Sequence, residues 1–331
     1  MKMIEYIESF ANHLKEALEI AKNSKLQKSN KRFNSVLIVG LGGSGIGGTI
    51  VKDIIATRCD VPVLSTKNYE IPGFVNKDTL VIVSSYSGNT EETISALKKC
   101  IIKNCEIAIV TSGGELKSIA KNQNYNHINI PSGNPPRAMF GYSFTILFCL
   151  LKHYKIINFD WEKDFYDSIS LLEKEKNNIK KEASRLASKI HGKTPVIYVA
   201  SGFEGAAIRF RQQLNENSKM LAWHHTIPEM NHNELLGWRI NTKDLAVIFL
   251  RNNCDLEKNQ TRIDISTKVI FKYSSNINEV WSKGSSVIQN TLYHINFGDW
   301  VSWFLSVLNN VDAVEIDVIN FLKHELSKNN E

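Results

Sequence analysis

The chain has 331 residues, a net charge of +6, 43% hydrophobic residues and 22% charged residues. This length predicts two domains, and the composition is that of a globular protein rather than of a disordered chain. A modest charge without a run of five Lys or Arg argues against nucleic acid as a partner. The most apolar stretch, 142–151, is too short to cross a bilayer, so no membrane partner is expected.

The cysteines indicate a reducing compartment. There are five, an odd number, and no Cys-x-x-Cys pair occurs among Cys59, Cys100, Cys105, Cys149 and Cys254. Neither a disulfide framework nor a zinc site is supported by this spacing. We therefore expect reduced thiols, a cytoplasmic location and no metal.

The first half of the chain alternates apolar runs with helical patterns. Residues 1–18 form a predicted amphipathic helix with no signal-peptide pattern, and a polar stretch follows to residue 34. Strands are predicted at 36–39, 61–64, 80–83, 107–110 and 127–130, and helices at 44–57, 90–102 and 142–153. Strands that alternate with helices indicate a doubly wound parallel sheet.

The second half repeats this organisation after a long helical pattern at 160–190, which contains no Gly or Pro. Strands are predicted at 196–200, 245–250 and 268–273, and helices at 204–217, 301–308 and 314–326. The predicted fold class is therefore α/β, with two doubly wound parallel-sheet domains and flanking helices. The domains are residues 1–157 and residues 158–331, the second beginning with the linker helix.

A glycine-rich loop, Gly40–Gly48, follows the first predicted strand and opens a helix. Its glycines let backbone N–H groups approach an anion, and Gly43 and Ser44 are candidate binding residues. The loop also matches G-x-G-x-x-G, but a dinucleotide site needs an acidic residue at the end of the second strand, which ends in Lys67. A turn that serves only close packing is the other alternative.

A second loop, Ser84–Thr93, is rich in hydroxyl groups and also lies between a strand and a helix. Ser85, Ser87 and Thr90 can hold a phosphate together with the backbone N–H groups of the helix start. A simple helix cap by Ser87 or Asn89 is the alternative. Capping does not require so many small hydroxyl residues, so phosphate binding is favoured.

Ser-x-Ser-Gly-x-Thr after a strand resembles the phosphate loop of sugar isomerase (SIS) domains. The whole set of motifs resembles the bifunctional phosphoglucose/phosphomannose isomerases, and the resemblance covers nearly the whole chain. Its motifs are Gly42–Gly45, Ser84–Thr93, 133–140, 215–219, 227–234 and the Leu322-Lys323 pair. It implies two SIS domains and no cofactor. The implied reaction interconverts glucose 6-phosphate with fructose 6-phosphate, and mannose 6-phosphate is a possible second substrate.

The resemblance also assigns catalytic roles for a proton transfer through a cis-enediol. Glu216, in Asn-Glu-Asn, is the implied base, and Arg137 stabilises the enediolate. His232 and Lys323 open the sugar ring. In the family this histidine comes from the neighbouring subunit, which implies a homodimer with shared active sites.

Residue types and spacing alone leave other interpretations of these residues open. His224 and His225 are rival acid–base groups, and a metal site could be drawn from them with Glu229 and His232, although His-Glu-x-x-His is absent. Each candidate also has a structural alternative. For Arg137 this is a salt bridge, for Glu216 and Lys323 a place in solvent on a helix, and for His232 a place on the surface or in the core.

One departure concerns the substrate. The family usually has a threonine shortly before the C-terminal lysine, associated with accepting mannose, whereas 313–317 reads Ala-Val-Glu-Ile-Asp. The glucose reaction is therefore the safer expectation. A non-catalytic SIS protein that senses sugar phosphates, or an amino-sugar phosphate isomerase, are the alternative functions.

Overall fold

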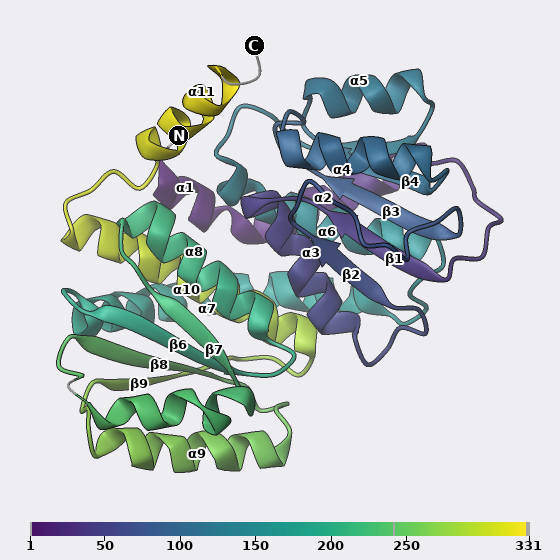
Figure 1. The fold of residues 1–331 in the computed structure, drawn as a ribbon. Coiled ribbons are helices and arrows are strands. Elements are labelled where there is room, and N and C mark those ends of the chain that lie inside the picture. Colours follow the sequence, from purple (N-terminus) through teal and green to yellow (C-terminus); the bar gives the residue numbers. More distant parts are fainter. Residues whose placement is uncertain (1, 241, 329–331) are drawn as a thin grey trace.

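The computed structural model describes residues 2–240 and 242–328. Residue 1 of the predicted helix 1–18, and residues 241 and 329–331 of the predicted domain 158–331, lie outside the described residues. Two parallel sheets with helices on both faces make up the fold (Figure 1). The predicted α/β class with two doubly wound sheets is confirmed. The boundary at residue 157 stays a prediction.

The first sheet contains the strands of the first half of the chain in the order β2-β1-β3-β4-β5, all parallel. They are β1 Ser35–Val39, β2 Val63–Thr66, β3 Thr79–Ser84, β4 Glu106–Thr111 and β5 Asn126–Asn129. The strand order reverses between β1 and β3. In open α/β sheets, ligands bind outside the carboxyl ends of the strands at such a switch point.

Helices cover both faces of the first sheet. On one face, α4 (Glu91–Ile102) and α5 (Gly114–Asn122) enclose a small apolar core. On the other face lie α2 (Phe10–Lys22), α3 (Gly42–Ile55) and α6 (Phe140–His153). Because both faces are buried, β1 and β3 are continuous apolar runs rather than alternating patterns.

The second sheet has the order β7-β6-β8-β9 and is also parallel. Its strands are β6 Thr194–Ala200, β7 Trp223–Ile227, β8 Leu245–Arg251 and β9 Ile277–Trp281. The outer face packs on α9 (Glu257–Phe271). The inner face packs on α7 (Trp161–Ile190), α8 (Glu204–Ser218) and α10 (Val287–Leu308), which lie on the side of the first sheet (Figure 1).

The inner faces of both sheets share one apolar core, in which Val36 and Ile38 of β1 and Ile197 and Val199 of β6 take part. The two halves touch where α3 crosses α8. A Cβ on Gly205 would lie 2.6 Å from a side-chain carbon of Ile50, so this crossing requires glycine. Close packing of this kind fixes the position of α8 relative to the first sheet.

Three expectations differ from the structure. The predicted strand 268–273 is wrong, because these residues end α9, where Ile263, Ser266 and Ile270 are buried at helical spacing. The predicted N-terminal helix is two helices, α1 (Met3–Glu8) and α2. The predicted helix 301–308 is the last part of the much longer α10.

Several elements lie outside the predicted set, namely α5, β7 and β9. The C-terminal helix α11 (Asp317–Lys328) begins later than predicted and runs away from the rest of the chain in Figure 1. None of the helices within the described residues has the length and apolar character needed to cross a membrane.

Candidate active site

The glycine loop lies at the carboxyl end of β1, beside the switch point. A Cβ on Gly45 would lie 2.1 Å from the carbonyl oxygen of Gly40, so the tight turn into α3 requires glycine. The hydroxyl of Ser44 is buried and accepts a 2.9 Å hydrogen bond from the backbone N–H of Tyr86. This bond joins the glycine loop to the hydroxyl loop.

The hydroxyl loop follows β3, on the other side of the switch point. Ser85 is buried, and its Oγ lies 2.8 Å from Oγ1 of Thr90. The exposed Ser87 accepts a 3.2 Å bond from the N–H of Asn89. Thr90 is the N-cap residue of α4 and makes no side-chain cap bond, so the alternative of a cap by Ser87 or Asn89 is not what the structure shows. The positive end of α4 thus faces a group of hydroxyls, an arrangement suited to a phosphate.

Tyr86 connects this loop to the segment that carries Arg137. Its hydroxyl oxygen accepts a 3.0 Å hydrogen bond from the N–H of Asn134. The short 3-10 helix η1 (Pro136–Met139) then begins at Pro136, where proline fixes the backbone. The glycine loop touches the same helix, since a Cβ on Gly43 would lie 3.0 Å from the backbone of Arg137.

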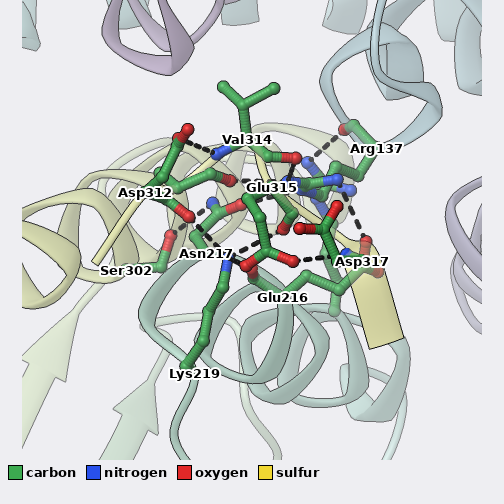
Figure 2. A network of polar contacts seen from close by, with 11 residues as sticks. Arg137, Glu216, Asn217, Lys219, Ser302, Asp312, Val314, Glu315 and Asp317 are labelled. Carbon is green, nitrogen blue, oxygen red and sulfur yellow. Dashed lines mark hydrogen bonds and ion pairs between the residues drawn. The ribbon is translucent and has the colours of Figure 1, made fainter. Parts of the chain in front are cut away.

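Arg137 is almost fully buried and binds groups from the second half of the chain. Its Nε donates a 2.8 Å hydrogen bond to Oδ1 of Asn217, and its Nη1 lies 3.2 Å from Oε2 of Glu216. Its Nη2 donates to the carbonyls of Ala313 and Val314. Burial lowers the pKa of Arg137 from its ordinary value, and the carboxylate of Glu216 opposes this shift. Figure 2 shows the convergence of these groups.

Glu216 lies in the last turn of α8, with about a quarter of its side chain exposed. Its neighbour Asn217 is buried and donates a 2.9 Å bond to Oγ of Ser302 on α10. The helix is therefore fixed beside Glu216 while the carboxylate itself stays accessible. An accessible carboxylate can come within hydrogen-bond reach of a bound molecule, which is the geometric requirement for a general base.

Lys219 is a residue whose role the sequence did not reveal. It ends α8 in the left-handed conformation, with φ of 55°. Its Nζ donates to the carbonyl oxygens of Glu216 and Glu315, each at 2.8 Å, and to that of Asp312. Figure 2 shows Lys219 between the end of α8 and the segment 312–315. Lys219 and Arg137 thus hold this segment from two sides.

A buried ion pair lies behind Arg137. The guanidinium of Arg209 on α8 pairs with Asp299 on α10 at 2.8 Å, donates to the carbonyl of Arg137 and stacks on the ring of Phe140. Burial raises the pKa of Asp299, and the charge of Arg209 opposes this. This pair supports η1, and neither residue belonged to a motif in the sequence.

His232 and Glu216 are not brought together within one chain. His232 ends the 3-10 helix η2 (Glu229–His232), and its side chain is exposed. In this helix Met230 belongs to the outer core of the second sheet, and Asn231 donates a 2.8 Å bond to Ser266 of α9. Glu216 precedes the amino end of β7 (Trp223–Ile227), whereas η2 follows its carboxyl end, so His232 and Glu216 lie toward opposite ends of this strand.

Lys323 lies on α11, and the structure also leaves it apart from Glu216. The first residue of this helix, Asp317, is beside the Arg137 cluster in Figure 2, but the helix then runs outward (Figure 1). It exposes the apolar side chains of Val318, Phe321 and Leu322. Lys323 is therefore on an uncovered helix in the single chain.

The rival histidines have partners of their own. Nδ1 of His225 lies 2.7 Å from Oε2 of Glu234, whose other oxygen accepts bonds from Tyr198 and Trp223. Burial acts to raise the pKa of Glu234, but these hydrogen bonds outweigh it and the pKa is lowered. Within the described ranges, no three His, Cys, Asp or Glu side chains are placed to hold a metal together.

The sheets, the two loops at the switch point and the Arg137–Glu216 pair define a two-sheet protein of the sugar isomerase (SIS) class. The family described as the bacterial phospho-glucose isomerase C-terminal SIS domain matches residues 179–326. The bifunctional phosphoglucose/phosphomannose isomerase of Caldicellulosiruptor bescii is 35% identical over 98% of this chain and 99% of its own length. The chain belongs to the bifunctional phosphoglucose/phosphomannose isomerase family.

Two further similarities are more distant. The D-glucosamine-6-phosphate 4-epimerase of Sulfolobus acidocaldarius is 35% identical, over 62% of this chain and 64% of that protein. The C-terminal domain of glucosamine-fructose-6-phosphate aminotransferase from Francisella tularensis has a TM-score of 0.74 at 13% identity, covering 95% of this chain and 98% of that one. The second similarity concerns the fold alone.

Proposed function

We propose that the protein is an aldose–ketose isomerase that interconverts glucose 6-phosphate, and also mannose 6-phosphate, with fructose 6-phosphate. The observation that carries this proposal is the accessible carboxylate of Glu216, held 3.2 Å from the guanidinium of Arg137 next to the two loops at the switch point. The sequence relatives of similar length support it, since they are named for both activities.

In this mechanism Gly43, Ser44, Ser85, Ser87 and Thr90 bind the phosphate. Glu216 takes the proton from C2 of the open-chain aldose and returns it to C1, while Arg137 stabilises the negative charge of the enediolate. Arg137 has five N–H donors, and its protein contacts leave one of those on Nη1 for the substrate.

Ring opening is assigned to His232 of a second copy of the chain together with Lys323, in a cytoplasmic homodimer. The separation of His232 from Glu216 toward opposite ends of β7 supports this assignment, because one chain alone leaves the site incomplete. The reaction would serve carbohydrate metabolism, in glycolysis and gluconeogenesis, without a cofactor or a metal.

A coupled assay of the purified protein on fructose 6-phosphate tests the proposal. Glucose 6-phosphate and mannose 6-phosphate are measured separately, with and without EDTA, and we expect both products and equal rates in the chelator. Formation of neither product would refute the proposal. Because one relative is named for glucosamine 6-phosphate, that compound is tested in parallel, and its conversion alone would favour an amino-sugar enzyme.

A further inference from the structure

The C-terminal end of α4 brings two cysteines into contact. Asn104 adopts the left-handed conformation, with φ of 55°, and its N–H bonds to the carbonyl of Ile101. The N–H of Cys105 then bonds to the carbonyl of Cys100 at 3.2 Å. A helix ending with these two backbone hydrogen bonds places the side chains of its first and last residues against each other, usually as an apolar contact.

The contact is suited to a disulfide. A disulfide joins residues whose Cα atoms are roughly 4.4–6.8 Å apart, and the 3.2 Å backbone bond between Cys105 and Cys100 holds these two residues close together. The thiols of Cys100 and Cys105 interact with each other in the structure. Bond formation therefore requires little movement of the backbone.

The two thiols have different surroundings. Cys100 is fully buried in the core between the first sheet and α4. Cys105 is at the edge of this core, 8% exposed, with its Sγ 3.3 Å from the carbonyl of Asn76. A surface hollow lined by Lys31 and Tyr125 lies beside it. A small reagent therefore reaches Cys105 before Cys100.

The charges nearby favour the same order of reaction. The interaction with Cys100 lowers the pKa of the Cys105 thiol, and Lys31 and Lys103 act in the same direction against the effect of burial. The pKa of Cys100 is raised by the interaction with Cys105 and by burial. Cys105 therefore ionises more readily than Cys100.

We propose that Cys100 and Cys105 form a dithiol site that a hydroperoxide oxidises reversibly to a disulfide. The Cys105 thiolate attacks the peroxide, takes an OH group to become a sulfenic acid, and the alkoxide or hydroxide leaves with a proton from water. The sulfur of Cys100 then attacks the sulfenic sulfur, and its proton leaves with the OH as water. Two electrons pass from the dithiol to the peroxide.

The contact between the two thiols makes the disulfide the end point of their oxidation. A sulfenic acid next to a thiol condenses with it, and further oxidation to a sulfinic acid is avoided. Two other cysteines have different partners: the exposed Cys254 accepts a bond from Asn290, and the Sγ of Cys59 faces backbone carbonyls. Cys100 and Cys105 are therefore distinct from them in chemistry.

The test is mass spectrometry of the reduced full-length protein after limited hydrogen peroxide. We expect a loss of two hydrogens that dithiothreitol reverses. Trypsin cuts after Lys103, so the disulfide would appear as two joined peptides that separate on reduction. In Cys100→Ser, Cys105 should instead gain oxygen, whereas the control Cys254→Ser should form the disulfide as the native chain does.

Oxygen added to Cys105 in the native protein, or oxidation confined to Cys254, would overturn the proposal. Both results are read from the native chain, so the test does not depend on the folding of the serine variants. The isomerase assay is independent of this measurement, and either proposal can fail alone.

Discussion

The Glu216 carboxylate and the Arg137 guanidinium lie 3.2 Å apart, although they come from parts of the chain that build different sheets. The pair exists because η1 and the end of α8 are both fixed by buried partners, Arg209 below η1 and Ser302 beside α8. The geometry of the proposed base is therefore a property of the contact between the two sheets.

Replacing Glu216 with Gln should abolish isomerisation and leave sugar phosphate binding nearly intact. The amide has the same shape but cannot take a proton, and a loss of turnover of about 10² or more is expected. Steady-state kinetics and a binding titration measure the two effects. Glu204→Gln, on the first turn of the same helix, is the matched control, and normal turnover in Glu216→Gln would remove this residue from the mechanism.

Replacing Arg137 with Met should destabilise the fold. Glu216, Asn217 and two carbonyls lose their donor, and removing one partner of a buried pair costs about 3–5 kcal/mol. Urea unfolding measures the change. The control is Arg185→Met, because its pair with Glu182 is exposed and should contribute about 0–1 kcal/mol. Equal effects of the two substitutions would contradict a structural role for the Arg137 cluster.

Replacing Lys219 with Met should lower turnover more than substrate affinity. Methionine has a similar length and the same cost in the left-handed conformation, so the change removes only the ammonium that holds Glu216 and the segment 312–315. Small displacements of a catalytic group are costly, and we expect a loss of kcat of about 10-fold or more with little change in KM.

The control is Lys193→Met, whose ammonium also binds a backbone carbonyl, that of Lys243, but makes no contact with Glu216 or the segment 312–315. Turnover should be unaffected there. A Lys219→Met protein with the native kcat would show that this lysine only ends the helix.

Inactive variants should rescue each other if His232 serves the neighbouring subunit. A hybrid of Glu216→Gln and His232→Ala chains would collect both lesions in one site and leave the other intact. Random mixing of equal amounts in a closed two-fold dimer then restores up to about one quarter of the activity. The measurement is the activity of hybrids verified by mass after co-expression.

The matched control for this experiment pairs Glu216→Gln with Arg137→Lys. Both residues act from the same chain, so every site of that hybrid is damaged and no rescue should occur. Absence of rescue in verified Glu216→Gln and His232→Ala hybrids would rule out the shared site, and would leave the isomerase assignment intact.

The sequence predicts those parts of the fold in which local pattern and burial agree. The central strands β1, β3, β6 and β8 are recognisable because burial on both faces makes them continuous apolar runs. The edge strand β7, Trp-His-His-Thr-Ile, is mostly half-buried and gives no such signal. The end of α9 contains adjacent apolar residues that imitate a strand.

The candidate site likewise has parts that the sequence predicts and parts that it does not. The two loops can be recognised because each is a local sequence between a strand and a helix. The contacts of Lys219 with the carbonyls of Asp312 and Glu315 join segments more than ninety residues apart, and carbonyls exist at every position. A bond to the backbone leaves no trace in residue type, so this part of the site required the structure.

The contact between Gly43 and Arg137 has a consequence for the evolution of the chain. A Cβ on Gly43 would lie 3.0 Å from both the Cα and the backbone nitrogen of Arg137, and backbone atoms cannot rotate away as a side chain would. Even alanine at this position would press on η1 and tilt the guanidinium relative to Glu216. The glycine loop and the arginine that faces Glu216 therefore cannot drift independently, because any side chain at residue 43 would have to be matched by a displacement of the η1 backbone.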